Sequence, residues 1–434
     1  MRQPRRQCLL FAMKHTPSPL LCSSMLFGAT LAATVLIAAL LKVVWQTARP
    51  SIAIPDLSPR GPVGRSNGNS VISLALAYTS FRSTDELRRL TSGRAGRVTG
   101  NRDEVWRLLE AEAPTLRLIQ EAMVQPGCEL LTAPLWSTNG VEDPGWSQLG
   151  RLAALEIEIR AIDQSLSNAL SQGLGLVRLG HRLENAGGTT RHYLNAHSMK
   201  QAGLALLRRL ASDHQAAPDQ LVQISQELTP LSANLHGLSN AIRWDHQFGW
   251  LDLSNSVASA AGVGGATLYG PLFDPTRTQQ KLAMQSARAL ESLELTYREA
   301  AVRSPGETNR SVWLLMLKGN AAGEILAEIA GASSERLSRL KCSENNSVAM
   351  TRIMLAVRAF QLTKGRSPTD LRELVPEYLV AVPTDDFDGQ PLRYSSKDTR
   401  VWSVSENLRD DGGVPQDQAK NRLDDILKLE PSKN

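Results

Sequence analysis

The sequence predicts a mainly α-helical protein that begins with a transmembrane helix and ends with a small α+β module containing a β-hairpin. Three observations support this fold class. An uncharged apolar segment lies near the N-terminus, apolar residues recur every three or four positions through most of the chain, and a short alternating pattern lies near the C-terminus. The chain has 434 residues, 42% hydrophobic and 21% charged, which is the composition of a folded protein of two or three domains.

Six parts follow one another in the predicted organisation. They are a cytoplasmic tail (1–15), a transmembrane anchor (16–45), a flexible linker (46–69), an exported α-helical domain (70–342), an α+β module (343–413) and a polar acidic tail (414–434). The linker is assigned because Pro, Gly, Ser and Asn dominate it, and these residues disfavour helix and strand alike.

The anchor is predicted from charge and hydropathy together. No charged residue occurs from Thr16 to Leu41, and about 20 apolar residues span a bilayer as a helix. The basic residues that precede this segment favour a cytoplasmic N-terminus; they are Arg2, Arg5, Arg6 and Lys14. A cleaved signal peptide is the alternative, but its apolar run is usually about 7–15 residues long. We therefore expect an uncleaved, single-pass anchor and a C-terminal body outside the cytoplasm.

The positive net charge does not indicate nucleic-acid binding. The chain carries a formal charge of +5, but residues 1–50 hold six Lys and Arg and no acidic residue. The remainder has 42 basic and 43 acidic residues, so it lacks the excess of positive charge with which proteins displace counterions from phosphates. We expect no nucleic-acid partner.

The helical domain shows its strongest periodicity over residues 151–183. The apolar residues that form the stripe are Leu152, Leu155, Ile159, Ile162, Leu166, Leu170 and Leu174. The segment is too long for an ordinary single helix, so we expect a break near Gly173 or Gly175. Further helices are predicted within 192–213, 217–228, 275–300 and 309–331. Because no fixed repeat relates them, an irregular bundle is predicted rather than a repeat array.

No catalytic site is predicted in this domain. The domain contains six histidines, but no two of them are paired at i, i+4 beside a glutamate, as they would be on a zinc-binding helix. We therefore expect each histidine side chain to be solvated or locally hydrogen-bonded. The six are His181, His192, His197, His214, His236 and His246. The Gly-rich segment 261–271 lacks the spacing of a phosphate-binding loop. The sequence therefore predicts a protein that is not an enzyme.

Two cysteines belong to the exported domain. Cys8 and Cys22 lie in the tail and anchor, which leaves Cys128 and Cys342. In an oxidising compartment these two form one disulfide, or they are two separate buried thiols. The sequence leaves both alternatives open.

The C-terminal module begins with a helix over 347–365. Met350, Met354, Val357 and Phe360 share one face of it, and Gly365 ends it. A second helix is expected over 367–379, with Ser367 as its N-cap and Pro368 in the first turn. Residues 391–396 and 400–405 alternate as two strands of a hairpin.

Within this module, the stretch FDGQPLRY suggests how the hairpin is held. We expect Phe387 to be a buried anchor, Gly389 to permit a turn and Pro391 to stiffen entry to the strand. We expect Tyr394 and Trp402 to pack against the apolar face of the first helix, because an isolated hairpin is only marginally stable.

The order of these motifs carries a resemblance to a known family. Residues 349–413 resemble the C-terminal part of the major pseudopilin of bacterial type II secretion systems, over about 65 residues. The positions that match its motifs are Phe360, Gly365, Pro368, Pro383, Asp385, Phe387, Gly389, Pro391, Tyr394, Ser405, Gly412 and Gly413. The same arrangement occurs as an appended module in membrane-anchored helical bacterial proteins, which residues 151–210 and 268–300 also resemble. The chain lacks the leader of a pseudopilin, so we do not expect it to be processed or to polymerise as one.

The resemblance also implies a calcium site, because the tail of the pseudopilin binds calcium. The carboxylates that would supply it are Asp410, Asp411, Asp424 and Asp425. This chain lacks the Gly-x-Asp-Gly order of the family, and Arg409 adds a positive charge. The alternatives are a calcium site and a solvated acidic tail, and no other cofactor is expected.

These observations together predict a location and a function. The expected location is the inner (cytoplasmic) membrane of a bacterium, with the body periplasmic or otherwise extracytoplasmic. The expected function is that of a non-enzymatic, membrane-anchored assembly or interaction protein of the cell envelope, with protein partners related to secretion. The alternative is an envelope sensor or binding protein whose helical domain holds a small ligand.

Overall fold

The part of the chain that the structure describes is mainly helical, as the sequence predicts. The computed structural model describes residues 56–59, 68–92, 101–130, 144–161, 165–212, 216–260, 273–303, 320–331, 333–414 and 425–428. These residues form 13 α-helices and one small three-stranded antiparallel sheet. All of them belong to the unit Ile54–Asn434.

The predicted membrane anchor falls outside the described residues. The same holds for the cytoplasmic tail, most of the linker and the Gly-rich segment 261–271. Among the helices that are described, none combines the length and the apolar character needed to cross a membrane.

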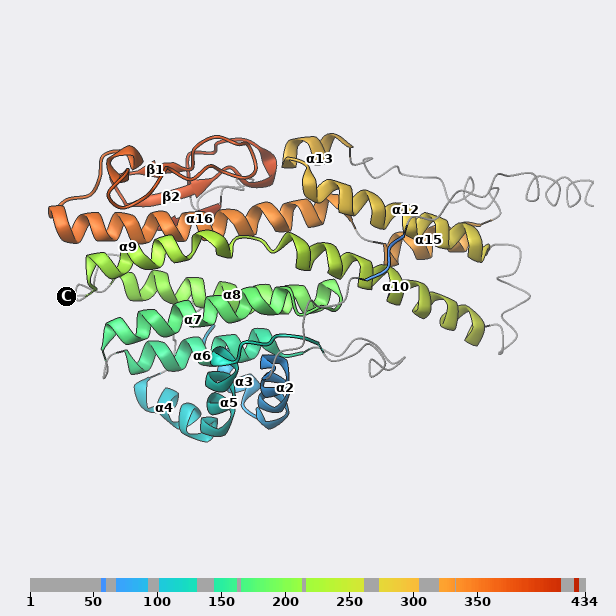
Figure 1. The fold of residues 1–434 in the computed structure, drawn as a ribbon, viewed down its shortest axis with the longest axis horizontal. Coiled ribbons are helices and arrows are strands. Elements are labelled where there is room, and N and C mark those ends of the chain that lie inside the picture. Colours follow the sequence, from blue (N-terminus) through green and yellow to red (C-terminus); the bar gives the residue numbers. More distant parts are fainter. Residues whose placement is uncertain are drawn as a thin grey trace, which may run out of the picture. The chain divides into compact units, whose positions relative to one another are not determined.

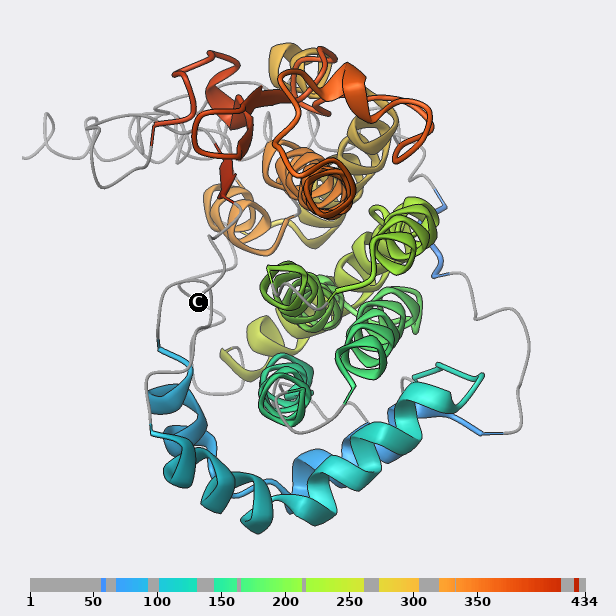
Figure 2. The ribbon, with the colours of Figure 1, turned by 90° about the vertical axis from the view of Figure 1, so that its left-hand side faces the viewer.

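The first four described helices form a layer beside the central bundle. They are α2 (Ser70–Ser80), α3 (Thr84–Leu90), α4 (Arg102–Ala111) and α5 (Ala113–Val124). Asn69 and Asn101 are their clearest start signals, because each side chain accepts a hydrogen bond from a backbone N–H in the first turn that follows. Helix α2 packs on α5 and α6, and Figures 1 and 2 show this layer on the side of the bundle away from α16.

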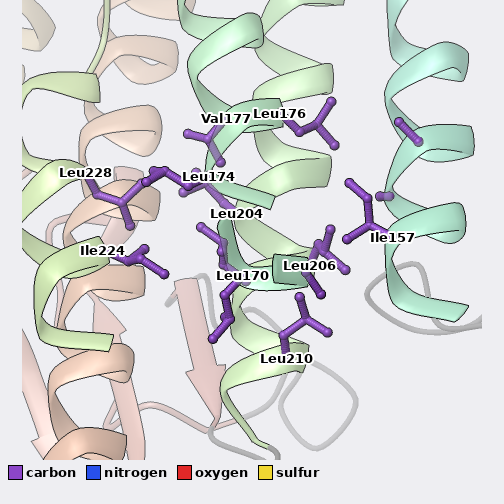
Figure 3. Packing of buried hydrophobic residues seen from close by; sticks show 14 of the residues in the cluster. Ile157, Leu170, Leu174, Leu176, Val177, Leu204, Leu206, Leu210, Ile224 and Leu228 are labelled. Atoms are coloured by element: carbon purple, nitrogen blue, oxygen red, sulfur yellow. The ribbon is translucent and has the colours of Figure 1, made fainter. Parts of the chain in front are cut away.

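The centre of the bundle is built on the predicted apolar stripe. Its elements are α6 (Trp146–Arg160), α7 (Leu166–Glu184), α8 (Thr190–Ala211), α9 (Pro218–Glu227), η3 (Thr229–Leu231) and α10 (Leu235–Ala260). The stripe residues that the structure describes are buried, and Figure 3 shows Leu170 and Leu174 of α7 meeting Leu204 of α8. Burial of such aliphatic side chains contributes about 1.5–3 kcal/mol each.

The predicted break within 151–183 is in a different place. Helix α6 ends at Arg160 and α7 begins at Leu166, whereas Gly173 and Gly175 lie inside α7. A Cβ atom at Gly173 would lie 3.0 Å from Leu207, and one at Gly175 would lie 2.8 Å from Met123. These glycines therefore allow neighbouring helices to approach closely and do not end the helix.

Two more glycines bring the backbones of α7 and α8 together. A Cβ atom at Gly180 would lie 2.6 Å from the backbone nitrogen of Lys200, and one at Gly203 would lie 2.7 Å from the side chain of Val177. This close approach places the buried Lys200 directly against α7.

The remaining helices include one long helix, against which several others of the bundle pack. They are α12 (Pro275–Glu294), α13 (Tyr297–Arg303), α15 (Ala321–Ala330) and α16 (Ser334–Lys364), the last of 31 residues. Helix α16 packs on α8, α9, α12 and α13 (Figure 1). The predicted boundary between residues 342 and 343 therefore falls inside a continuous helix.

Basic residues of α16 bind the C-terminal ends of three neighbours. Lys341 donates to the carbonyls of Leu293 and Leu295 at the end of α12, over 3.1 and 2.8 Å. Arg352 donates to Ser225 in the last turns of α9, and Arg358 donates to the carbonyl of the final residue of α8. Carbonyls at helix C-termini lack partners within their own helix, so these contacts satisfy them and oppose the negative end of each helix dipole.

The C-terminal module lies on the face of α16 away from α8 and α9 (Figure 1). Its elements are η5 (Leu371–Leu374), β1 (Arg393–Ser395), β2 (Arg400–Ser403), η6 (Ser405–Asn407) and β3 (Asp425–Lys428). The predicted hairpin is confirmed, since β1 pairs with β2 in antiparallel register. The second predicted helix is only the 3₁₀ turn η5, which begins after Asp370 and not after Ser367.

One strand was not predicted. Strand β3 lies within the segment 414–434, which the sequence presents as a polar tail, and it pairs with the far edge of β2. It covers an edge of the hairpin that would otherwise expose unpaired backbone groups.

Candidate functional site

Two networks of polar side chains lie in the interior. We call the first the charged cluster; its members are His181, Glu184, Tyr193, His197, Lys200 and Glu344. We call the second the module network; its members are Asn346, Asp385, Arg393 and Ser403.

Three helices supply the charged cluster. His181 and Glu184 lie three residues apart on α7 and share one face. Tyr193, His197 and Lys200 follow at four and three residues on α8, which again places them on one face, and α16 adds Glu344. Each helix therefore turns charged groups towards the same point in the interior.

Lys200 lies at the centre of the cluster, with a side chain that is 0% exposed. Its Nζ donates to Glu184 Oε2 over 3.1 Å, to Glu344 Oε1, and to the carbonyl of Ser232 over 3.0 Å. The same nitrogen lies 3.3 Å from Nδ1 of His181. A buried ammonium group needs such partners, because an unpaired charge in the interior costs several kcal/mol.

The second oxygen of each glutamate lies on the side of His197. Glu344 Oε2 accepts a hydrogen bond from Tyr193 over 2.9 Å and lies 3.3 Å from His197 Nδ1. Glu184 Oε1 lies 4.0 Å from the same nitrogen. Glu184 Oε1 accepts no hydrogen bond, and the contact of His197 Nδ1 with Glu344 Oε2 is an ion-pair contact without hydrogen-bond geometry.

The charges of the cluster shift the pKa values of its members. Burial and the adjacent carboxylate of Glu344 raise the pKa of Glu184 well above its usual value. Burial acts in the same sense on Glu344, but the imidazole of His197 and the ammonium of Lys200 outweigh it, so the pKa of Glu344 is lowered. The carboxyl group of Glu184 therefore holds a proton more tightly than that of Glu344 does.

Burial and the charge of Lys200 lower the pKa of His181 to about 4. The imidazole is thus neutral at physiological pH, and its Nδ1 can accept a hydrogen bond from Lys200. Burial and the carboxylate of Glu344 raise the pKa of Tyr193 well above its usual value, so its hydroxyl remains a donor.

The geometry limits what the cluster can do chemically. The side chains of Glu184, Lys200 and Glu344 are 0% exposed, while His181 and His197 are 21% and 17% exposed. Such a group can hold a proton or a small cation that enters past an imidazole edge, but it gives a larger substrate no contact with the carboxylates.

The module network is built around Asp385, which is 0% exposed. Its carboxylate accepts five hydrogen bonds, from the side chains of Asn346, Arg393 and Ser403 and from two backbone N–H groups, at 2.7–3.0 Å. Asn346 lies on α16, while the other donors belong to the loop and the hairpin. Asp385 therefore fixes the loop and β2 to the helix.

The sequence-predicted residues of the module lie as follows. Phe387 is 2% exposed, and its ring packs edge-on against Tyr297 of α13, with the ring centres 4.8 Å apart. Phe360 is buried against Tyr378, and Pro368 is also buried. Gly365 and Gly389 adopt φ values of +70° and +73°, which a residue with a Cβ atom rarely adopts. Pro391 is exposed and forms an antiparallel bridge with Thr384.

The two aromatic residues of the hairpin differ in position. Tyr394 packs against the main hydrophobic cluster, of which Met350, Met354 and Val357 are members. Trp402 does not, because side chains alternate along β2 and Val401 and Ser403 are the ones that point inward. The indole of Trp402 instead covers Gly413 and donates to Asp410 over 3.0 Å.

The aspartates predicted to bind calcium, where the structure describes them, form bonds within the C-terminal module. Asp410 accepts hydrogen bonds from Trp402 and Gly412, Asp411 accepts one from Asn407, and Asp425 pairs with Ser403 in the sheet. Asp424 lies outside the described residues. In the described part of the chain, metal-ligating side chains converge instead at Glu184, His197 and Glu344, and calcium binding at the tail stays a prediction.

Cys128 and Cys342 are free cysteines, so the structure has two separate thiols and not the disulfide. The physical reason is their placement. Cys128 packs against the main hydrophobic cluster, whereas Cys342 is buried in a small separate cluster with Tyr297, Phe387 and Val404.

Sequence reasoning missed the charged cluster. It treated His181 and His197 separately and did not consider Lys200, although the spacing of Tyr193, His197 and Lys200 was a usable signal. A lysine at a position where the helical period calls for an apolar residue needs a buried counter-ion.

Comparisons with protein-family models, with curated proteins and with solved structures found no match to this chain.

Proposed function

We propose that the chain is a membrane-anchored, non-enzymatic assembly protein of the bacterial cell envelope, which binds partner proteins through its C-terminal module. The observation that carries this proposal is the attachment of the module to α16. The buried Asp385 ties loop and hairpin to that helix, and α16 is itself tied to α8, α9 and α12. A module held in this way presents a surface of fixed shape, which is what protein recognition requires.

The module also exposes apolar side chains that suit such contacts. Val380, which follows η5, is 77% exposed, and Val375 in the same segment is 36% exposed. Exposed apolar residues at a rigid edge are typical of protein-binding surfaces, although single ones occur on every protein. The resemblance to a pseudopilin supports partners related to secretion.

The membrane part of the proposal has its own test. A reporter that is active only in the cytoplasm is fused after Asn434 of the full chain. We expect it to be silent, because the basic residues before the apolar segment hold the N-terminus inside. Strong reporter activity would refute the orientation and with it the location of the body.

The partner is tested by cross-linking and co-purification of the full chain from native membranes in detergent. We expect a partner that is recovered with the wild type and with Val124→Asp, but at least about tenfold less with Val380→Asp, because a buried charge weakens an interface by several kcal/mol. Val124 is a matched control, since it is 79% exposed but belongs to α5. Equal recovery with both variants, or no partner at all, would contradict the proposal.

A second candidate function is that of a binding protein whose helical domain holds a small ligand. The observation in its favour is the charged cluster, where two carboxylates and an imidazole of three helices converge within 4.8 Å of one another.

A further inference from the structure

The two glutamates of the charged cluster each use one oxygen for Lys200 and turn the other towards His197. Lys200 contacts Glu184 Oε2 and Glu344 Oε1, whereas His197 Nδ1 lies 4.0 Å from Glu184 Oε1 and 3.3 Å from Glu344 Oε2. The lysine and the histidine therefore lie against different oxygens of the same carboxylate pair.

The side that faces His197 is incompletely bonded. Glu184 Oε1 accepts no hydrogen bond although its side chain is 0% exposed, and the 3.3 Å contact of His197 Nδ1 with Glu344 Oε2 lacks hydrogen-bond geometry. Buried polar atoms in folded proteins nearly always have a well-aligned partner, so this incompletely bonded carboxylate oxygen beside the imidazole nitrogen calls for an explanation. A cation between them would satisfy both atoms at once.

We infer that Glu184, His197 and Glu344 form a binding site for one divalent transition-metal ion, with Zn²⁺ as the best match. Zinc accepts a mixed set of imidazole nitrogen and carboxylate oxygen, whereas calcium and magnesium favour oxygen alone. Ligand atoms at about 2.0–2.2 Å from a tetrahedral zinc ion are about 3.3–3.6 Å from one another. The separations of 3.3 and 4.0 Å from His197 Nδ1 approach these values, so small side-chain rotations complete the site.

The surrounding residues fit this assignment. Lys200 keeps its contacts with the opposite oxygens and so holds the carboxylates in place, and Tyr193 donates to Glu344 Oε2 as a supporting hydrogen bond. His197 is the most exposed of the three ligands, at 17%, so we place the entry of the ion and a water as the fourth ligand on its side. The inference is independent of whether the chain assembles with envelope proteins.

The test uses the full chain, purified in detergent without a polyhistidine tag, with Zn²⁺ alone as the ligand. We expect one Zn²⁺ per chain and a rise in unfolding temperature on adding it, because an ion that binds only the folded state stabilises that state. His197→Gln and Glu184→Gln should each weaken binding at least about tenfold. Glutamine has nearly the same shape as glutamate, so Glu184→Gln keeps the packing of the cluster.

His246→Gln is the matched control. Nδ1 of His246 is also buried and without a partner, but it belongs to α10 and to no group of metal ligands in the described residues. This variant should bind Zn²⁺ as the wild type does. Equal binding by His197→Gln and Glu184→Gln, or no rise in unfolding temperature in the wild type, would overturn the inference.

A second measurement needs no variant and decides the matter if a substituted chain fails to fold. Diethylpyrocarbonate modifies free imidazoles, and peptide mass spectrometry of the wild type reports each histidine separately. Zn²⁺ should reduce the modification of His197 at least about fivefold while that of His246 stays unchanged, since a ligated nitrogen cannot react. Equal modification of His197 with and without Zn²⁺ would refute the site.

Discussion

The module network and the charged cluster are both buried and both centred on carboxylates, yet they differ in how completely those carboxylates are bonded. Asp385 accepts five hydrogen bonds, and none of its oxygens lacks a partner. In the charged cluster, Glu184 uses one oxygen for Lys200 and leaves the other without a donor. The same chemical group is thus saturated in one place and unsaturated in the other.

The difference indicates different roles. A saturated buried network fixes one arrangement of the backbone, because any other arrangement would leave its groups unpaired. An unsaturated one costs stability, so its presence points to a task beyond holding the fold. The module network is therefore structural, and the charged cluster is the place where a ligand is to be sought.

The largest effect is expected at Phe387, which adjoins the module network. Its side chain is 2% exposed, and its backbone N–H donates to the carboxylate of Asp385. Phe387→Ala should lower the free energy of unfolding of the module by about 3–5 kcal/mol, because it opens a cavity beside Tyr297. Limited proteolysis of the full chain should release the C-terminal segment sooner than in the wild type. Equal survival of that segment would show that the packing of Phe387 is unimportant.

The next prediction makes one chemical change in both networks. Asp385→Asn should lower the free energy of unfolding by about 3 kcal/mol. The NH₂ of the new amide would face hydrogen-bond donors, so that these buried donors would lose their acceptor. Glu184→Gln should lower the free energy of unfolding by less than about 1 kcal/mol, because Glu184 Oε1 accepts no hydrogen bond and an amide oxygen can still accept from Lys200. Urea unfolding of the two variants gives both values. Equal costs would remove the distinction between the saturated and the unsaturated carboxylate.

An effect of intermediate size is expected at Asp245 of α10, whose contribution to the stability of the fold depends on pH. It accepts a backbone hydrogen bond from Thr190 over 3.2 Å, and burial raises its pKa to about 6. Because the pKa is higher in the folded than in the unfolded chain, its contribution to stability is complete below about pH 4 and is lost as the pH rises through about 6.

Asp245→Asn should abolish this dependence. We expect the variant to be more stable than the wild type by up to about 3 kcal/mol at pH 8 and to match it near pH 4. Unfolding midpoints measured across this pH range test the prediction. A stability difference that does not vary with pH would mean that the pKa of Asp245 is not raised in the folded protein.

The smallest effect is expected at the two thiols. Burial raises the pKa of Cys128 to about 12, and burial together with Asp386 raises the pKa of Cys342 as well. Both should react with iodoacetamide at pH 7.5 at least about tenfold more slowly than an exposed cysteine. Peptide mass spectrometry reports the two sites separately, and Cys342 should become reactive in Phe387→Ala. A disulfide-linked pair of peptides in the unreduced protein would contradict the free thiols of the structure.

Local signals in the sequence predicted much of the fold. The apolar stripe of α6 and α7, the end of α16 at Gly365 and the hairpin all depend on neighbouring residues, and all are confirmed. The break at Gly173 was predicted wrongly because a glycine that ends a helix and one that admits a neighbouring helix look alike in sequence. The charged cluster could not be assembled from local signals, because Glu344 lies 144 residues after Lys200.

That separation has a consequence for how the protein is made. A ribosome that adds about 5–20 residues per second adds Lys200 roughly 7–30 s before it reaches Glu344. During this interval Lys200 has only half of its carboxylate partners, and the apolar face that α16 will cover is open. The interior therefore closes only after α16 has been made, and a nascent chain stopped before Glu344 retains an exposed core that chaperones and proteases can recognise.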